Sequence, residues 1–197
     1  MGGQKDTKGS MIKVVIIGIV LVCLAGGYYY YLTNRDKAET EEAPKATVLE
    51  AALSYNFDRS YPPTPKEVVK LYGQITQCLH NETYTDQEFE KLALQIQNLY
   101  DDELIANKTQ NQYLEDLKWD IKNIREQEIV ISSFATGAST DVEYYSVDGH
   151  SFAKLPGTFT MRKGTFLEVT DEIFLLRKDA DGRWKIYGWT VAGEGQE

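Results

Sequence analysis

Few residues in this chain have the types and spacing that catalysis requires. The run Gly149-His150-Ser151-Phe152-Ala153 approaches the G-x-S-x-G pattern, in which a turn between a strand and a helix presents a serine nucleophile. Its fifth residue is alanine, however, and the surrounding pattern indicates antiparallel strands. Asp141, Tyr144 and His150 form the one group that could converge for proton transfer, and nothing in their spacing requires it. We therefore predict no catalytic residues and leave an enzymatic activity open.

Metal ligands are equally sparse. The chain holds 2 His and 2 Cys, and neither His80 nor His150 has further ligands at metal-binding spacing. Asp179-x-Asp181-Gly182 resembles the start of a calcium loop, but the twelfth position is Thr190, where an EF-hand needs a glutamate. This stretch indicates a hairpin turn instead. We expect no metal site and no cofactor.

The residues best suited to contact a ligand are aromatic. Tyr72, Tyr100 and Trp119 fall on predicted helices, and Trp189 falls on the last predicted strand. Aromatic side chains line ligand pockets, and they equally fill hydrophobic cores. We name these four as the candidate ligand-binding residues of one pocket, and of the two interpretations we favour core packing.

Three amphipathic helices must position these side chains. Thr64 and Pro65 start a pattern of apolar residues, spaced three and four apart, that runs to about His80. Thr85-x-x-Glu88 is a capping box before a second helix that could continue to Ile105. A third helix covers 114–124, and Thr47-x-x-Glu50 could cap a short helix earlier in the chain.

The pattern changes to that of strands beyond Gln127. Strand-like stretches cover 129–136, 142–147, 151–163, 165–178 and 183–191. Pro156-Gly157 indicates a bulge or corner in the third stretch, and 179–182 indicates a hairpin turn. We predict an α+β fold with three helices packed on a curved antiparallel sheet of about four strands, preceded by a transmembrane helix.

The predicted transmembrane helix is residues 14–32. These 19 residues carry no charge, and as a helix they would span roughly 28 Å, close to the thickness of bilayer hydrocarbon. Lys5, Lys8 and Lys13 precede the segment, whereas 18 cations and 29 acids follow it, so the positive-inside rule places the N-terminus in the cytoplasm. A cleaved signal peptide ending at Ala25-Gly26-Gly27 is the alternative.

The resulting layout has five parts. We expect a cytoplasmic tail at 1–13, the membrane helix at 14–32, a stalk at 33–60, one extracellular domain at 61–192 and a tail at 193–197. The expected localisation is the cell membrane, with a single pass.

The last hairpin carries a resemblance to a known superfamily. From Phe174 to Trp189 the chain has a strand, a turn with glycine, then Arg-Trp-Lys-Ile and an aromatic residue. With three helices before long strands, 61–192 resembles the NTF2-like (SnoaL-like) superfamily. The YPPTPKEVV and LYDDELIANK stretches are also similar to single-pass membrane proteins of Gram-positive bacteria. The resemblance implies a curved sheet around a helix with a pocket in the cone, and it implies no particular activity.

Two functions follow as hypotheses. The net charge of −9 argues against nucleic acid as a partner. We expect a membrane-anchored extracytoplasmic interaction or assembly module. Its expected partners are envelope proteins or a second copy of the chain. In layout it resembles the anchored NTF2-like subunits of conjugation and secretion machines. The alternative is a small-molecule-binding protein, or an isomerase-like or dehydratase-like enzyme, that uses the cone pocket. An open cavity with an Asp or His of shifted pKa beside a Tyr would favour the alternative.

Overall fold

The helices of the domain begin at side chains that cap them. The computed structural model describes residues 47–193, and this part holds α2 (Val48–Leu53), α3 (Pro65–Asn81), α4 (Asp86–Gln97), α5 (Asp102–Ala106) and α6 (Gln110–Glu126). Thr47, Thr64, Thr85, Asp101 and Thr109 each accept a hydrogen bond from a backbone N–H of the first helical turn. The capping boxes at Thr47 and Thr85 form as the sequence predicts.

One antiparallel sheet follows the helices. Its strands are β1 (Ile129–Thr136), β2 (Glu143–Val147), β3 (His150–Lys163), β4 (Phe166–Lys178) and β5 (Trp184–Val191), in the order β1-β3-β4-β5. β2 also pairs with β3, on 150–154, whereas β1 pairs with β3 on 157–163. The short 3-10 helix η1 (Ser139–Asp141) joins β1 to β2.

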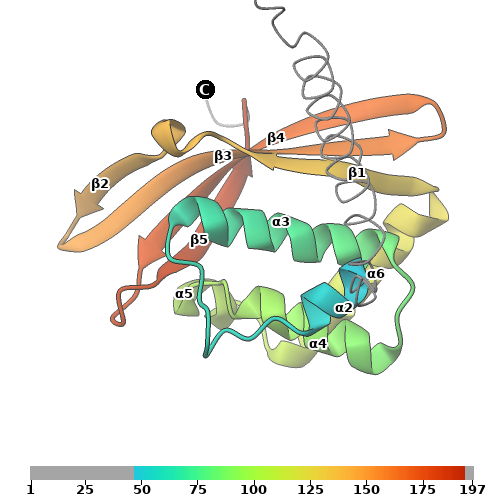
Figure 1. Ribbon diagram of the computed structural model, residues 1–197, viewed down its shortest axis with the longest axis horizontal. Coiled ribbons are helices and arrows are strands. Elements are labelled where there is room, and N and C mark those ends of the chain that lie inside the picture. Colours follow the sequence, from blue (N-terminus) through green and yellow to red (C-terminus); the bar gives the residue numbers. More distant parts are fainter. Residues whose placement is uncertain (1–46, 194–197) are drawn as a thin grey trace, which may run out of the picture. The chain divides into compact units, whose positions relative to one another are not determined.

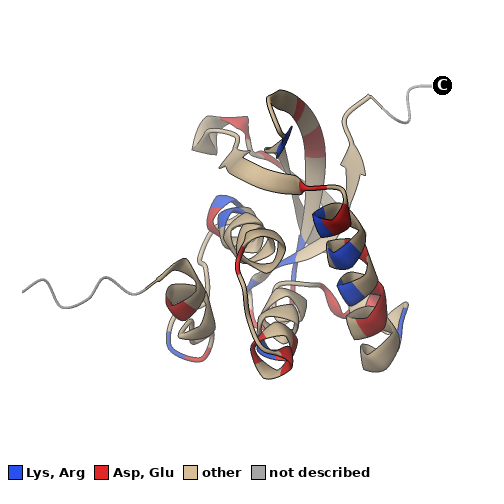
Figure 2. Ribbon diagram, turned by 90° about the vertical axis from the view of Figure 1, so that its right-hand side faces the viewer, with Lys and Arg blue, Asp and Glu red and all other residues tan. Residues whose placement is uncertain are grey.

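The helices cover one face of the sheet, with α3 lying across it (Figure 1). Phe174, Leu155 and Ile186 from the sheet are fully buried, as are Val68 and Ile75 of α3. The contact between α3 and the sheet is close at Gly73, where an added Cβ would lie 1.9 Å from Cδ1 of Phe134. Charged residues of both signs lie on the helices (Figure 2).

Side chains and loops cover parts of the two outer strands. The Asn81 amide donates to the Ile131 carbonyl at 2.8 Å and accepts from the Ile131 N–H at 3.0 Å, on β1. On β5, Ile186 donates its N–H to the Leu99 carbonyl, and its own carbonyl accepts from Asp101, both at 2.8 Å. The chain between α4 and α5 is thereby fixed against β5.

Residues before 61 pack on the same domain. Leu49, Leu53 and Phe57 pack against the hydrophobic core. The Tyr61 hydroxyl donates to the Trp184 carbonyl at 2.8 Å. The described part of the predicted stalk therefore contributes α2 and its apolar side chains to the domain.

The membrane prediction needs correction. Residues 14–32 lie outside the described residues, and no helix within 47–193 is long and apolar enough to cross a bilayer. The longest, α3 and α6, have 17 residues each and carry charged side chains such as Lys66 and Lys118. The structure therefore supports an α+β domain, and it does not support the N-terminal transmembrane helix, the single-pass architecture or the cell-membrane localisation.

The element count and one strand also differ from the prediction. Residues 47–193 hold five α-helices and five strands, where three helices and about four strands are predicted. α2 is the short helix that Thr47-x-x-Glu50 indicates ahead of the predicted domain. α5 has five residues, too few to show a helical period, and it is separated from α4 by the bridge to β5. β3 passes through Pro156-Gly157 without a bulge or corner, in continuous register with β4. Membership of the NTF2-like superfamily stays a prediction.

Candidate functional site

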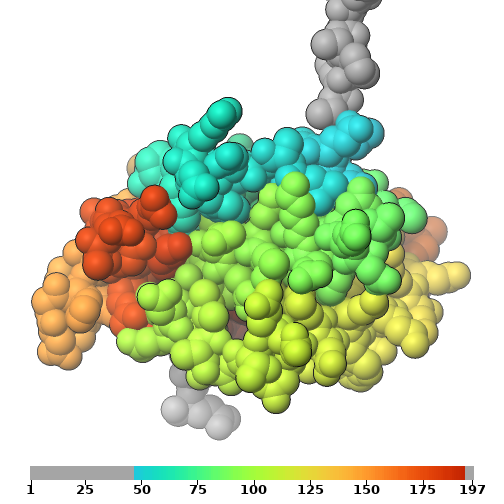
Figure 3. All heavy atoms as spheres, turned by 90° about the horizontal axis from the view of Figure 1, so that it is seen from below, coloured from blue at the N-terminus to red at the C-terminus, as the bar shows by residue number. Residues whose placement is uncertain are grey.

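A cavity of about 670 Å³ opens among the helices beneath the sheet. Seen from the helix side, the surface is hollowed between the green atoms of α5 and the yellow-green atoms of α6 (Figure 3). α3, α5 and α6 supply most of the wall, with residues from the end of α4 and Trp189 from β5. This volume is within the range of small-molecule sites.

All four aromatic residues predicted from the sequence line this cavity. Tyr72, Tyr100 and Trp189 form one cluster, with ring centroids 5.8 to 6.2 Å apart. Tyr113, which the sequence analysis did not select, extends the cluster at 6.4 Å from Tyr100. Trp119 lines the cavity from α6, where it is 66% exposed. The structure thus brings three of the predicted residues into contact, while their binding role stays a prediction.

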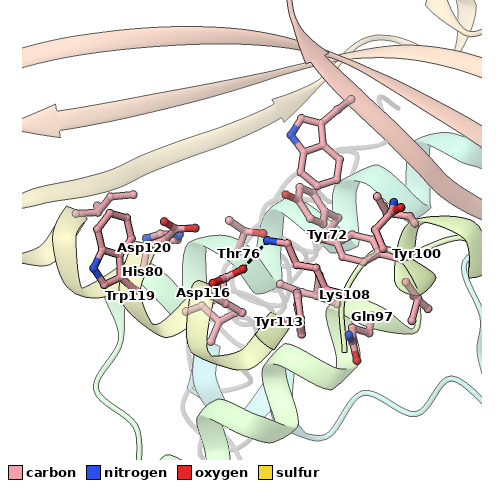
Figure 4. Close-up of a pocket in the computed structure, with 18 of the residues that line it drawn as sticks. Tyr72, Thr76, His80, Gln97, Tyr100, Lys108, Tyr113, Asp116, Trp119 and Asp120 are labelled. Atoms are coloured by element: carbon pink, nitrogen blue, oxygen red, sulfur yellow. Dashed lines mark hydrogen bonds and ion pairs between the residues drawn. The ribbon is translucent and has the colours of Figure 1, made fainter. Parts of the chain in front are cut away.

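Two polar residues of α3 that line the cavity each have one buried side-chain atom without a protein partner. Thr76 Oγ1 and His80 Nδ1 are buried, and neither has a hydrogen-bond partner among the described residues. They lie four residues apart, so both are on the helix face that also carries Tyr72 (Figure 4). Buried polar atoms are nearly always hydrogen-bonded, so two such atoms in one cavity mark a place for hydrogen-bonding groups from outside the protein.

The ionisable groups deep in the cavity are held neutral. Burial, together with the nearby Arg125 cation, lowers the pKa of His80 to about 4. Burial likewise raises the pKa values of Tyr72, Tyr100 and Tyr113 well above their ordinary value. The Tyr113 hydroxyl donates to the Ala93 carbonyl at 3.1 Å. A neutral imidazole and neutral phenols therefore form the polar part of the interior at pH 7.

Charged groups lie on the solvent side of the lining. Lys108, just before α6, forms an ion pair with Asp116 of α6 at 2.5 Å, drawn as a dashed line in Figure 4. Both side chains are more than half exposed. Asp120, one turn further along α6, also lines the cavity. The exposed part of the lining therefore carries two carboxylates and one ammonium.

A buried ion pair fixes the wall that α5 forms. Arg177 of β4 donates to both carboxylate oxygens of Asp101, at 2.6 and 2.9 Å, and to Glu103 at 2.7 Å. The Asp101 side chain is 4% exposed and also caps α5. Glu103 accepts a further hydrogen bond from the Tyr187 hydroxyl. Because Tyr100 precedes Asp101, this pair also holds one ring of the aromatic cluster in place.

A second arginine holds the end of α3. Arg125 of α6 donates to the carbonyls of Leu79, His80 and Glu82, which are left without helical partners at a helix C-terminus. Its guanidinium lies 4.9 Å from the ring centroid of Tyr84. Arg125 therefore fixes the turn that carries His80 and keeps a positive charge beside the imidazole.

The structure does not bring the other candidate residues together. Asp141 accepts from the Ala138 N–H next to η1, the Tyr144 ring packs 5.7 Å from Trp184, and exposed His150 begins β3. Gly149 to Ala153 lie in the β2–β3 hairpin, which is antiparallel as expected and unlike a nucleophile elbow. Asp179 caps the turn before β5 through its carboxylate. No cluster of three metal-ligating side chains occurs within 47–193.

Thr76 and His80 are the residues that sequence reasoning missed. One signal could have identified them: Tyr72, Thr76 and His80 recur every four residues on the apolar face of a predicted helix. Polar side chains at core-facing positions need partners, so this stripe predicts a polar contact inside the fold.

Comparison with known proteins gives a family and no activity. A search of curated proteins finds no match. The family model described as "Domain of unknown function (DUF6715)" matches residues 3–189, which is most of the chain. This protein therefore belongs to the DUF6715 family.

Proposed function

We propose that this domain binds a small organic molecule in the cavity between α3, α5, α6 and β5. The observation that carries the proposal is the pair of buried atoms without protein partners, Thr76 Oγ1 and His80 Nδ1, on two residues that line the cavity. They lie beside an aromatic wall that offers apolar contact area. An apolar pocket with a few convergent polar groups and a residue of shifted pKa is the usual composition of a ligand site.

This choice follows the alternative hypothesis from the sequence. The cavity is open and contains a histidine of lowered pKa near tyrosines, which is the feature that distinguishes the two hypotheses. The aromatic side chains form one wall and leave about 670 Å³ unfilled. The assembly role, with envelope proteins or a second copy as partners, stays a prediction from the sequence.

A titration with a fluorescent probe tests the proposal. We expect the full-length protein to bind the uncharged probe N-phenyl-1-naphthylamine with saturable, 1:1 stoichiometry, read as the rise in probe emission on direct excitation. Leu117 lines the cavity, so Leu117→Trp should weaken binding at least about fivefold, or about 1 kcal/mol. Leu114 lies one turn earlier on α6 and outside the lining, so Leu114→Trp is the matched control.

The titrations of the parent protein and the two variants can support or reject the site. Circular dichroism first establishes that each variant is folded. Saturable binding that Leu117→Trp weakens and Leu114→Trp does not supports the site. Absence of saturable binding by the folded protein, or equal affinities in all three proteins, rejects it.

A further inference from the structure

The interior of the cavity offers hydrogen bonds and no charge. The polar side chains that α3 contributes to its lining are a phenol, a hydroxyl and an imidazole, from Tyr72, Thr76 and the nine-tenths buried His80. The charged lining residues, Lys108, Asp116 and Asp120, are exposed on the solvent side. An ion transferred into such an interior would lose its hydration. The nearest cation, Arg125 beside His80, already donates to three backbone carbonyls and does not line the cavity, so a charged ligand group is disfavoured there.

The aromatic wall offers a surface and leaves no slot between its rings. The Trp189 centroid lies 5.8 Å from Tyr72 and 5.9 Å from Tyr100, and those two are 6.2 Å apart. Rings at these separations are in contact with one another, so a ligand cannot insert between them. It can instead pack against the side of the cluster that faces the cavity, where a flat or compact ring system buries the most area.

The two unpartnered atoms fix where the ligand must be polar. Thr76 and His80 are one helical turn apart, so their side chains start about 6 Å apart on one helix face. The Thr76 hydroxyl can donate or accept, and the uncharged imidazole of His80 offers either function at Nδ1, depending on its tautomer. A ligand hydroxyl or carbonyl reaching this stripe satisfies atoms that the fold leaves without partners.

We infer that the ligand is an uncharged ring compound bearing a hydroxyl or carbonyl group, with its ring on the Tyr72–Tyr100–Trp189 cluster and its oxygen at Thr76 and His80. The inference rests on the proposed function, because it specifies the ligand of the same cavity. It excludes carboxylates and phosphates as the group that reaches the α3 stripe.

Three probes that share one ring system test the inference. 2-Naphthol, naphthalene and 2-naphthoate differ only in carrying a neutral hydroxyl, no polar group or an anion. Isothermal titration of each into the full-length protein gives the affinities. We expect 2-naphthol to bind at least about tenfold more tightly than 2-naphthoate, and several-fold more tightly than naphthalene.

Variants at Thr76 and His80 test whether these side chains cause the preference for 2-naphthol. Thr76→Val keeps the side-chain shape and removes the hydroxyl, so the preference for 2-naphthol over naphthalene should shrink while naphthalene binds as before. Thr76→Ser keeps a hydroxyl and should restore the preference. His80→Leu provides a second test at the other atom, and circular dichroism verifies the fold of each variant.

Each result bears on a different claim. Equal affinities for the three probes, or a preference that Thr76→Val and His80→Leu leave intact, overturn the inference and leave the binding site standing. Failure of all three probes to bind overturns the proposed function and the inference together. Tightest binding by 2-naphthoate also overturns the inference, since it would show that the interior accepts an anion.

Discussion

His80 is uncharged at neutral pH because of its position in the fold. Its folded pKa is about 4, against an ordinary value of 6.5. Between these values the unfolded chain binds a proton that the folded protein does not, so the free energy of unfolding falls as the pH is lowered from about 6.5 to about 4. The full shift corresponds to about 3 kcal/mol. Urea unfolding at a series of pH values measures this loss.

A matched pair of variants isolates that effect. His80→Gln should flatten the pH dependence in this window, because glutamine does not titrate. His150→Gln makes the same substitution at an exposed position, at the start of β3, and is the matched control. Glu172, whose pKa burial raises, contributes with the opposite sign in all three proteins and cancels in the comparison. An unchanged slope in His80→Gln would contradict the prediction.

Among single residues, the sequence allowed us to predict the aromatic side chains that line the cavity, but not its polar groups. Tyr72, Tyr100, Trp119 and Trp189 could be selected because large aromatic residues on predicted elements are rare and conspicuous. Thr76 and His80 are common types on a helix, and their significance depends on which atoms lack partners. That property arises only from tertiary packing, which decides where the Arg125 cation and the cavity lie.

Among the elements, α5 depends on the pair between Arg177 and Asp101. Arg177→Met would leave the Asp101 carboxylate, 4% exposed, without its cation. Breaking one side of a buried pair typically costs 3–5 kcal/mol, so we expect a loss of about 3 kcal/mol in unfolding free energy. Lys118→Met removes the partner of Asp86 in an exposed pair and should change stability by no more than about 1 kcal/mol. Chemical denaturation compares the two, and similar small losses would refute the distinction.

The packing of α3 on β1 depends on the absence of a side chain at Gly73. Alanine favours a helix over glycine by about 1 kcal/mol, but its Cβ would overlap the Phe134 ring. The ring centroids of Phe134 and Phe159 are 4.4 Å apart, so Phe159 prevents the Phe134 ring from moving away from an added Cβ. Overpacking costs about 1–3 kcal/mol, and Gly73→Ala should be destabilising by about 1–2 kcal/mol net.

Two further variants provide the controls for Gly73. Gly188→Ala adds a Cβ with no heavy atom within 4 Å and should change the melting temperature little. Phe134→Leu in the Gly73→Ala background should recover part of the loss, because the smaller side chain makes room. A double-mutant cycle by thermal denaturation measures the coupling, and additive effects would contradict the proposed contact.

Caps and turns were predictable at this scale because they are local. Thr64, Thr85 and the turn at 179–182 lie where the sequence indicates, since each depends on residues within one turn of chain. Pro156 misled the prediction because a proline usually interrupts a ladder. Its carbonyl accepts from Gly137 at 2.9 Å, in the gap between the parts of β3 paired to β1 and β2. A backbone N–H at Pro156 would point into the same gap, where no strand pairs with β3. The absence of that N–H therefore costs no hydrogen bond between strands.

Over the whole domain, β5 connects parts of the chain that are distant in sequence. Trp184 and Ile186 are buried in the core, Ile186 is bonded to the α4–α5 connection, and Tyr61 donates to the Trp184 carbonyl. Deleting 184–197 should therefore abolish cooperative thermal unfolding, followed by far-ultraviolet circular dichroism. Leu167→Ser, at a position 65% exposed on β4, should keep the cooperative transition. A sigmoidal transition in the deletion variant would refute this role.

The Asn81 side chain has a consequence for self-association. By pairing with both the N–H and the carbonyl of Ile131, its amide takes the place that a neighbouring strand would occupy on β1. Open strand edges recruit other chains by backbone pairing, and proteins commonly block them. Asn81→Ala should expose this edge, and light scattering on incubation at raised concentration should then detect aggregates that the parent protein does not form. One amide at the end of a helix thus helps to determine whether copies of this protein remain separate.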